Sequence, residues 1–505
     1  MGKILLLVMP PQLGLLEGFS SGLIALGNYI KLHNRDTRVR LLDLGPVAPS
    51  RTFEFVQAAL QGLSGTVFAG ITGSTAGYQS MLRTAKAFKD CSPGVITIFG
   101  GPHASAQDEV ILKRHSFVDF IIRGEGEIAL SSILQHYREP TRVPNLSFRV
   151  GDEIMKTDDA PSLDPAVLDL LDPYPTFPSE LSSPPGKFDR VTYVSARGCP
   201  LKCSFCAVRN SAIRAKSVPA VIEDLRHLAG QRGYKRIAIE DNFFAHQPRR
   251  TIELCAAIAQ LQKEVSFFWD CQTRVESMRR SDVVAAMAEA NCDAVYLGVE
   301  SLVPEQLQFL GKAQRPGKYL ECLSFEVAPK ILSAGIDMEI NLQLGIPGED
   351  ESHRTAALSE LNRLGRIAAR YGRKIVVSPQ LHVVYPGTPH FETYVANGAF
   401  GSLGTGVFEE FTGWEAEHQP ILTFFGEHFA HGNGGIPIGI LDRSELLRSE
   451  FRIEEKSICS LSSQLVAMEG IEGISIRKYG DYLTRAQETE EESGRGVVGA
   501  HGRAA

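Results

Sequence analysis

The chain has 505 residues, of which 43% are apolar and 22% charged, with 52 basic and 59 acidic side chains. This composition is that of a globular protein, and the length suggests about three domains. The net charge of −7 excludes a general basic field that would attract nucleic acid or an anionic membrane. No apolar stretch approaches the ~20 residues that a membrane span needs. Nine cysteines, an odd number, without an export signal indicate reduced thiols in a cytoplasm.

The first 150 residues alternate short apolar runs with helical patterns, as in a parallel sheet with crossover helices. The expected strands are Lys3–Val8, Arg38–Leu42, Thr66–Ile71, Val95–Phe99 and Val118–Ile122. The first of these runs has no polar alternation, which is expected when helices cover both faces of the sheet. The sequence therefore predicts an α/β, Rossmann-like domain over residues 1–150.

Small and polar residues follow these strands, at the edge where open α/β sheets bind ligands. They form the runs Thr72-Gly-Ser-Thr-Ala-Gly77, Gly100-Gly-Pro-His103 and Arg123-Gly-Glu-Gly-Glu127. Glycine lets a ligand approach the backbone closely, so these runs hold candidate cofactor contacts. The candidates are Thr72, Ser74, Gly100, Gly101 and Glu125. His103 stands alone, and metal ligands come in sets, so no metal is assigned to it.

Three further segments lack a sustained period. Residues 151–187 are rich in proline and predict an ordered linker. Residues 391–485 predict a smaller C-terminal capping region, and residues 486–505, acidic and then rich in glycine and alanine, predict a disordered tail.

Three cysteines lie together in Ser195-Ala-Arg-Gly-Cys199-Pro-Leu-Lys-Cys203-Ser-Phe-Cys206. Thiolates hold iron–sulfur clusters, and three of them leave one iron of a four-iron cube open to another ligand. Zinc is the alternative, although structural zinc usually has four ligands in paired units and the chain shows no second pair. The spacing predicts that Cys199, Cys203 and Cys206 bind a 4Fe-4S cluster.

A second α/β series begins after the linker. Its expected strands are Val191–Ser195, Lys235–Glu240, Val265–Asp270, Ala294–Glu300, Ile336–Leu344 and Lys374–Val384. Polar residues again stand at strand ends, among them Asp241, Gln272, Arg274 and Glu300. A carboxylate such as Glu300 can accept from an ammonium or ribose hydroxyl, and Arg274 can pair with a carboxylate. The alternative is that these charges satisfy one another or solvent.

The cysteine spacing, with Phe205 before the last cysteine, resembles the signature of the radical S-adenosylmethionine (SAM) superfamily. Glu240-Asp-Asn-Phe243, Gly298-Val-Glu-Ser301 and Gly345-Ile-Pro-Gly-Glu349 resemble further segments of that family. The resemblance implies a partial (β/α)6 TIM barrel over residues 188–390, with SAM on the open iron and Phe205 near its adenine. We expect further SAM contacts from Asp241, Gln272, Arg274 and Glu300, and assign no catalytic side chain.

The strand ends of the first domain, taken in order, resemble the cobalamin-binding domain that precedes many radical SAM domains. The D-x-H-x-x-G motif of other cobalamin enzymes is absent, as is common in that branch. The implied cofactors are a 4Fe-4S cluster, SAM and cobalamin. The implied partners are a small-molecule or peptide substrate and an electron donor such as flavodoxin or ferredoxin, with neither nucleic acid nor a membrane span.

The leading hypothesis is a cobalamin-dependent methyltransferase acting on an unactivated carbon, or phosphorus, of a biosynthetic intermediate. A second hypothesis keeps the radical chemistry without methyl transfer, giving a cyclase, a rearrangement enzyme or an oxidoreductase. A third is a non-catalytic cobalamin or redox sensor, which would be expected to carry a fourth cysteine and an output domain.

Overall fold

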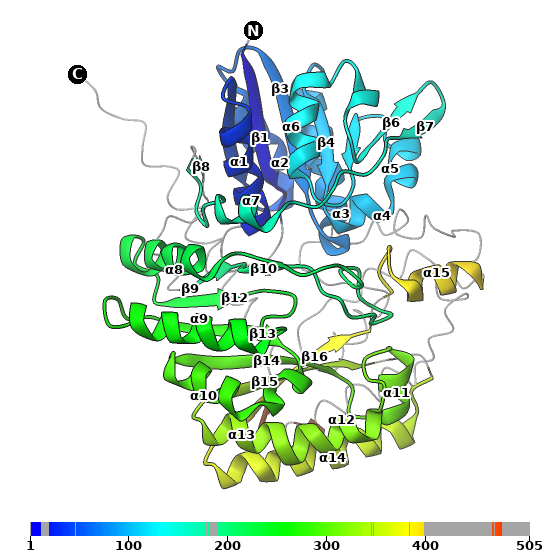
Figure 1. Cartoon of the computed structure of the whole chain (residues 1–505). Coiled ribbons are helices and arrows are strands. Elements are labelled where there is room, and N and C mark those ends of the chain that lie inside the picture. The colour runs from blue at the N-terminus through cyan, green and yellow to red at the C-terminus, as the bar shows by residue number, and fades with distance from the viewer. Residues whose placement is uncertain are drawn as a thin grey trace, which may run out of the picture.

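The computed structural model describes residues 2–11, 20–45, 47–176, 179–180, 190–344, 346, 348–382, 384–397, 467–468 and 470–476. Figure 1 shows two α/β units, with the N-terminal unit in blue to cyan above the unit in green to yellow. None of the helices in these ranges is long and apolar enough to cross a membrane.

The N-terminal unit is built on one sheet with the strand order β7-β6-β5-β4-β3-β1-β2-β8. Its strands are β1 (Lys3–Met9), β2 (Thr37–Asp43), β3 (Thr66–Thr72), β4 (Ile96–Gly100), β5 (Phe120–Ile122), β6 (Leu146–Val150), β7 (Glu153–Lys156) and β8 (Ser179–Glu180). Strands β2, β1, β3, β4 and β5 are parallel, whereas β6 and β7 pair antiparallel. Because β1 lies between β2 and β3, the winding direction reverses there, and such sheets bind ligands at this point.

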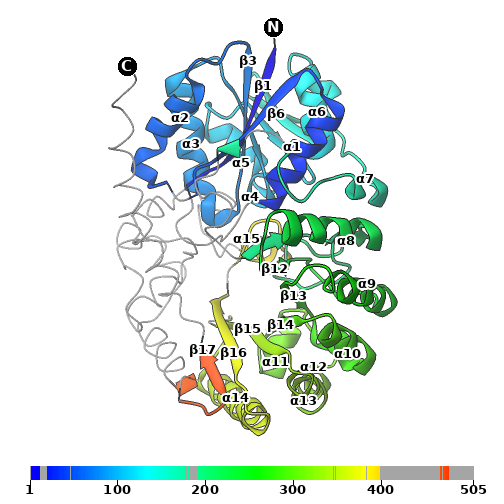
Figure 2. The same cartoon turned by 90° about the vertical axis from the view of Figure 1, so that its left-hand side faces the viewer.

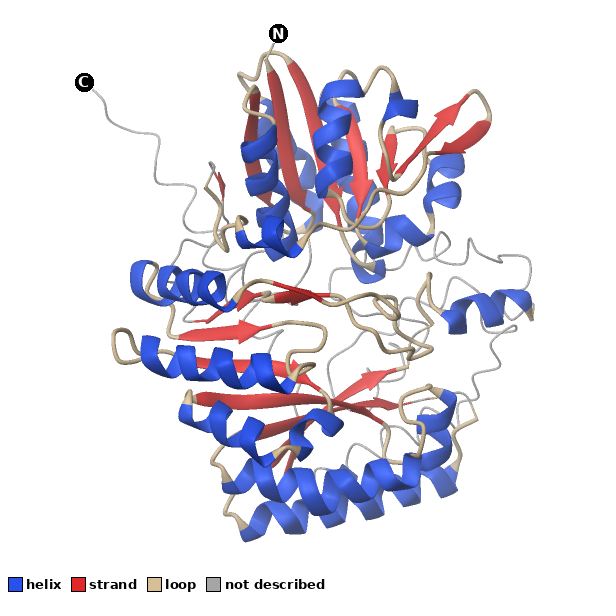
Figure 3. Ribbon diagram, viewed as in Figure 1, coloured by secondary structure: helices blue, strands red, loops and turns tan. Residues whose placement is uncertain are grey.

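Helices cover both faces of this sheet (Figure 3). They are α1 (Ser21–His33), α2 (Thr52–Leu60), α3 (Tyr78–Cys91), α4 (Pro102–Ala106), α5 (Asp108–Arg114), α6 (Glu127–His136) and α7 (Pro165–Asp169). Leu5 and Leu7 of β1 belong to a core shared with α1 and α6, whereas Leu6 belongs to a core shared with α2, α3 and α5. The unalternated apolar run of the first strand is thus explained by burial on both sides, as predicted.

The segment expected to be a linker takes part in this first unit. Residues 151–187 contain β7, which pairs with β6, and β8, which pairs with β2. Asn28 of α1 donates to the carbonyl of Tyr174 at 2.9 Å and so fastens the segment to the first domain. The sequence of this proline-rich segment did not predict these pairings, because very short strands leave almost no alternating pattern.

The second unit is an open sheet of parallel strands in the order β17-β16-β15-β14-β13-β12-β9. The strands are β9 (Arg190–Tyr193), β12 (Arg236–Ile239), β13 (Phe268–Thr273), β14 (Cys292–Glu300), β15 (Asp337–Leu344), β16 (Ile375–Leu381) and β17 (Ile474–Ile476). The six strands expected from the sequence are present, in chain order, and form the partial barrel. The strand β17, from residues far along the chain, adds an edge strand that the sequence did not indicate.

Helices lie along the outer face of this sheet (Figure 2). They are α8 (Val218–Arg226), α9 (Pro248–Leu261), α10 (Ser281–Glu289), α11 (Pro304–Phe309), α12 (Pro316–Cys322), α13 (Ala328–Ser333) and α14 (Glu351–Arg370), followed by α15 (Pro389–Ala396) after β16. Every second strand residue, such as Ile237, Cys271 and Leu297, enters the core under these helices. The alternate residues therefore face the inside of the barrel, and many of them are polar.

Most of the C-terminal expectations fall outside the described residues. The capping region over 391–485 is described only for the end of α15 and for a few residues around β17, and the tail over 486–505 is not described at all.

Candidate functional site

The loop that carries the three cysteines is closed at its base by a two-stranded ribbon. Strands β10 (Ala196–Arg197) and β11 (Arg214–Ala215) pair antiparallel on either side of it. Within the loop, Ser211 N donates to the carbonyl of Cys199 at 2.8 Å, and its hydroxyl accepts from Cys199 N at 2.9 Å. Gly198 has φ 93°, and a Cβ there would lie 2.2 Å from the carbonyl oxygen of Ala212. Only glycine fits this turn.

The three cysteines lie in one loop beyond the carboxyl end of β9. Burial is the main cause that raises the pKa of Cys206, and the charges of Cys203 and Cys199 raise it further, which places the three sulfurs within electrostatic reach. In the part of the chain that is described, no three His, Cys, Asp or Glu side chains converge as ligands of one metal ion.

Arg274, at the end of β13, lies beside the cysteine loop. Its Nη1 approaches Cys203 Sγ at 3.6 Å, and its Nη2 donates to the carbonyl of Lys312 at 2.7 Å. The sequence suggests that Arg274 pairs with a carboxylate. In the structure the carboxylate of Glu276 accepts hydrogen bonds from the Arg274 guanidinium at 3.0 and 3.2 Å. Burial tends to lower the pKa of Arg274, but the hydrogen bond and charge of Glu276 outweigh it and raise that pKa. The guanidinium therefore brings a fixed positive charge to Cys203.

Glu300 ends β14 in a strained backbone conformation. Its φ is 73°, which is uncommon for a residue other than glycine, and the register with β15 shifts between Gly298 and Glu300. The carboxylate accepts from Lys312 Nζ at 3.1 Å and from Gln343 Nε2 at 2.9 Å. A Cβ at Gly298 would lie 2.8 Å from Glu300 Oε1, so glycine there makes room for the carboxylate. Strain of this kind is often held at functional sites.

The hydrogen bonds continue from Glu300 to a buried histidine just after β16. Gln343 donates its amide to Glu300, so its Oε1 faces His382 Nδ1, at 2.7 Å. An amide oxygen only accepts, which fixes the proton of the neutral ring on Nδ1. His382 is 1% exposed, its pKa is lowered to about 4 mainly by burial, and its Nε2 has no hydrogen-bond partner among the described residues. Within the described part of the chain, this nitrogen is a buried acceptor that no donor reaches.

A second histidine joins His382 to the cysteine loop. The rings of His382 and His390 lie 5.4 Å apart, and that of Phe309 is 4.6 Å from His390. The backbone N of His390 donates to the carbonyl of Ser204, between Cys203 and Cys206. The ends of β13, β14, β15 and β16 therefore surround the loop with one connected set of polar groups.

Asp241, one of the predicted SAM contacts, makes hydrogen bonds to the segment that leads into the cysteine loop. Its Oδ1 accepts from Ser195 N at 2.6 Å and Ala196 N at 2.8 Å, and its Oδ2 accepts from Ser195 Oγ at 2.6 Å. It is 1% exposed, and burial raises its pKa to about 6 against the lowering effect of those hydrogen bonds. The carboxylate is thus committed to holding the segment that leads into the cysteine loop.

Two other predicted contacts have positions compatible with ligand binding. Gln272 is exposed and alternates with the core residue Cys271, so it stands on the inner face of the barrel. Phe205 is half-buried within the cysteine loop.

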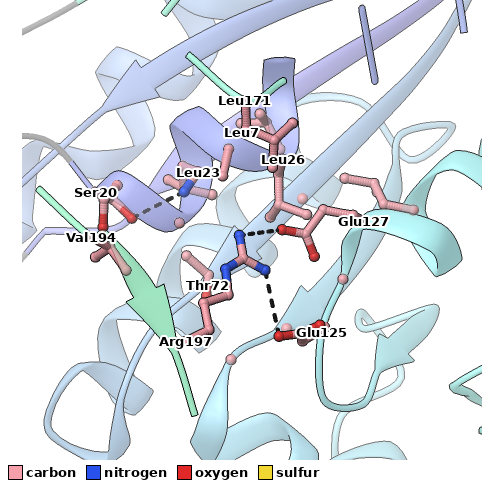
Figure 4. A pocket seen from close by; sticks show the side chains of 18 of the residues that line it. Leu7, Ser20, Leu23, Leu26, Thr72, Glu125, Glu127, Leu171, Val194 and Arg197 are labelled. Atoms are coloured by element: carbon pink, nitrogen blue, oxygen red, sulfur yellow. Dashed lines mark hydrogen bonds and ion pairs between the residues drawn. The ribbon is translucent and has the colours of Figure 1, made fainter. Parts of the chain in front are cut away.

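A cavity of about 390 Å³ lies between the two units (Figure 4). On the first unit it is lined by the carboxyl edge of the sheet and by α1; on the second, by the end of β9 and the start of the cysteine loop. Predicted contacts in the lining are Thr72, Gly100, Gly101 and Glu125. The predicted contact Ser74 is exposed and not in this lining. A Cβ at Gly101 would come within 2.7 Å of the Gly73 carbonyl oxygen, so the backbone there stays bare.

His103, to which the sequence assigns no metal, packs against Tyr78 of α3. It is 1% exposed, its ring lies 4.2 Å from that of Tyr78, and its Nδ1 is 3.1 Å from Thr75 Oγ1.

Several residues of the site were not singled out by the sequence. Arg197 and Glu127 stand inside motifs that were noticed, and their charge could have been a signal. Gln343 and His382 gave no signal in the sequence. A single amide and a single histidine can be recognised as a hydrogen-bonded pair only when their strands are seen to lie side by side. The same holds for Lys312, Arg214 and His390.

Comparisons with known proteins agree with this arrangement. Residues 193–361 match the model of the Radical SAM superfamily, and residues 27–134 match that of the B12 binding domain. An uncharacterized methyltransferase of Pyrococcus horikoshii is 26% identical over 407 residues, which cover 78% of this chain and 83% of that protein. The anaerobic magnesium-protoporphyrin IX monomethyl ester cyclase of Cereibacter sphaeroides is 24% identical, over 54% of this chain and 46% of its own length.

A solved structure has the same fold. The radical SAM methyltransferase TsrM of Kitasatospora setae, with cobalamin and a [4Fe-4S] cluster bound, superposes with a TM-score of 0.66 at 15% identity, covering 79% of this chain and 76% of its own. The two family matches indicate that the cofactors are a 4Fe-4S cluster, SAM and cobalamin, and that the protein is an enzyme. The chain therefore contains a domain of the radical SAM superfamily, over residues 193–361, preceded by a B12-binding domain, over residues 27–134.

Proposed function

We propose that this enzyme is a cobalamin-dependent methyltransferase that acts on an unactivated carbon, or phosphorus, of a small-molecule or peptide substrate. The observation that carries the proposal is the cavity between the units, whose lining runs from the switch point of the first sheet to Arg197, two residues before Cys199. A cofactor that carries a methyl group would, if bound in this cavity, lie next to the cysteine loop. The methyltransferase relative and the methyltransferase structure support the same conclusion.

The residues of the cavity fit a cobalamin-like group. Its walls combine apolar side chains such as Leu7 and Leu26 with hydroxyls such as Ser20 and Thr72, and bare glycine backbone forms part of the lining. Binding sites for large cofactors have this mixture of apolar surface and a few fixed polar groups. The volume of the cavity is within the range of small-molecule pockets. A cavity of this volume would hold part of a molecule as large as cobalamin.

The barrel end fits a cluster with SAM. We assign Cys199, Cys203 and Cys206 as the cluster ligands, and Arg274 as the cation that donates to Cys203. Glu300 and His382 are the acceptors for the donor groups of SAM, since the buried Nε2 of His382 is a hydrogen-bond acceptor that awaits a donor. When bound, these cofactors supply the deoxyadenosyl radical and the transferable methyl group. The chain orients them and excludes water.

A second function is supported by one comparison. The cyclase of Cereibacter sphaeroides stands beside methyltransferases among the relatives of this chain, so a radical reaction without methyl transfer is the competing proposal. The chain spans about half of that cyclase.

The products of SAM separate the two functions. We expect the anaerobically purified protein, supplied with hydroxocobalamin, a strong reductant and SAM, to form both 5′-deoxyadenosine and S-adenosylhomocysteine. S-adenosylhomocysteine reports transfer of the SAM methyl group, so its absence beside ample deoxyadenosine would replace the methyltransferase by the second function.

The cluster assignment has its own test. Cys203→Ala should abolish deoxyadenosine formation, because the cube loses a ligand. Cys91→Ala, which removes a thiol from α3 of the first unit, is the matched control and should retain it. Deoxyadenosine formation by the Cys203→Ala variant would show that Cys203 is not a ligand.

A further inference from the structure

The base of the cysteine loop carries two arginines placed side by side. In the ribbon of β10 and β11, Arg197 is directly opposite Arg214. Like charges on opposite residues of paired strands repel each other and destabilise the pairing. The ribbon therefore needs negative charge from elsewhere in the molecule.

That charge comes from the other unit. Glu125 and Glu127 stand in the turn after β5 and at the start of α6, in the N-terminal unit. Arg214 binds Glu125 with both of its Nη atoms, at 2.6 and 2.8 Å. Arg197 contacts Glu127 at 2.7 Å and Glu125 at 3.5 Å. The charges alternate as Glu127, Arg197, Glu125, Arg214, and we call these four residues the charge clamp.

The charge clamp is shielded from solvent, which strengthens it. The side chains of Glu127, Arg214, Arg197 and Glu125 are 4%, 16%, 23% and 29% exposed. Burial alone would raise the pKa of Glu125, but the hydrogen bond from Arg214 and the charge of Arg197 outweigh it and lower that pKa. Leu163 N also donates to Glu125, at 3.2 Å. Forked, partly buried pairs of this kind fix geometry as well as charge.

The same side chains line the cavity. Arg197, Glu125 and Glu127 all contribute to its wall, and Figure 4 shows the Arg197 guanidinium between the two carboxylates. Arg197 is also linked through Gly198 to the first cysteine of the loop. One group of charges thus bounds the cofactor cavity and anchors the loop of the cluster.

We propose that Arg197 and Arg214 are positioning residues that hold the cysteine loop on Glu125 and Glu127 of the B12-binding domain, so that the contents of the cavity and the geometry of the cluster loop depend on each other. The proposal deepens the proposed function and rests on it for the identity of the two cofactors. The structural part, that carboxylates of one unit order the loop of the other, stands on the contacts alone.

Glu127→Gln tests the structural part without any cofactor chemistry. It keeps the shape of the side chain and removes the charge opposite Arg197. We expect amide hydrogen exchange across residues 196–215 to rise at least tenfold, about 1.4 kcal/mol of opening free energy, while exchange in the strands of the first sheet stays unchanged. Glu264→Gln, which removes an exposed ion pair between the turn after α9 and Arg226 of α8, is the matched control and should leave that loop unchanged.

A double-mutant cycle distinguishes the loss of this specific contact from general misfolding. If Glu125 and Arg214 act through each other, Glu125→Gln combined with Arg214→Gln should accelerate exchange no more than the worse single variant. Arg214→Lys, which keeps the charge and loses the fork, should fall between wild type and Arg214→Gln. Unchanged exchange in Glu127→Gln, or fully additive effects in the cycle, would overturn the clamp.

The functional part is measured separately. In Glu127→Gln loaded with cluster and hydroxocobalamin, we expect weaker hydroxocobalamin binding and an altered electron paramagnetic resonance spectrum of the reduced cluster. A wild-type protein that binds no corrinoid would contradict the proposed function while the exchange result still decides on the clamp. Faster loop exchange with an unchanged cluster spectrum and corrinoid affinity would overturn the coupling.

Discussion

Single side chains at this site serve the loop of the cluster more than they serve a ligand. Asp241 and Arg274 are both predicted to contact SAM, and both also make several hydrogen bonds within the protein. Asp241 accepts from Ser195 and Ala196, and Arg274 donates to Glu276 and to the carbonyl of Lys312. Hydrogen-bonding capacity that is used inside the protein is no longer offered to a ligand. Glu300, which is held in a strained backbone conformation, and His382, whose Nε2 has no hydrogen-bond partner among the described residues, are further candidates for contact with SAM.

The buried carboxylate of Asp241 predicts a pH dependence of stability. Its pKa is raised from 3.8 to about 6 in the folded protein, chiefly by burial. The folded protein therefore holds the proton more tightly than the unfolded chain does, and stability should fall as the pH rises from about 4 to about 6. Asp241→Asn can still accept from both backbone N–H groups and can donate to Ser195 Oγ, so it should remove this fall.

The effect can be followed by thermal unfolding on either side of that window. Relative to wild type, Asp241→Asn should gain up to about 3 kcal/mol between about pH 4 and about pH 7. The control is Asp152→Asn, an exposed residue in the turn between β6 and β7, which should follow wild type. An Asp241→Asn variant with the wild-type pH profile would show that the carboxylate is not the cause.

At the scale of elements, the short ribbon of β10 and β11 decides where the cysteines lie. The ribbon closes the loop, Asp241 holds the segment before it, and Ser211 ties its far side to Cys199. The cysteines themselves sit in backbone without regular structure. Their positions therefore depend on these few contacts, and on the glycine that turns the chain at residue 198.

Gly198→Ala should reduce cluster binding strongly. The added methyl group would lie 2.2 Å from the Ala212 carbonyl, so the two sides of the loop would have to separate. We expect iron and sulfide content after anaerobic reconstitution to fall at least severalfold. Gly151→Ala is the matched control, because Gly151 also has a positive φ, 61°, but has no atom within 4 Å of the added Cβ. Full iron content in Gly198→Ala would refute this account of the loop.

At the scale of the whole molecule, the two units share one cavity and one network of charges. The carboxyl edge of the first sheet faces the end of β9 and the start of the cysteine loop there, where the two units meet (Figure 1). A ligand in this place would contact both units. Its binding should therefore stabilise them together.

Hydroxocobalamin is the probe for this prediction. At saturation it should slow hydrogen exchange in the first unit around residues 122–130 and also in the second unit around residues 192–197, because both segments line the cavity. At a concentration about 100 times its Kd, the stabilisation should be about 2.7 kcal/mol. Protection confined to the first unit would place the corrinoid elsewhere.

Periodicity and spacing were sufficient for the architecture. Apolar runs located the five strands of the first domain and six of the barrel, because burial on one or both faces leaves a pattern in the local sequence. The linker expectation did not describe β7 and β8, whose few residues carry no such pattern. The capping region lies mostly outside the described residues and stays a prediction.

The amino-acid sequence by itself indicated the family and the cofactors and predicted the three cysteine ligands, because each depends on residues that are close together in the chain. Only the tertiary structure decided which charges meet. Glu127 and Arg197 are 70 positions apart, Gln343 and His382 are 39 apart, and neither pair leaves a trace in local spacing. Electrostatic and hydrogen-bond energies depend on distance in space, and that distance is fixed only when the two sheets and the ribbon between them have packed.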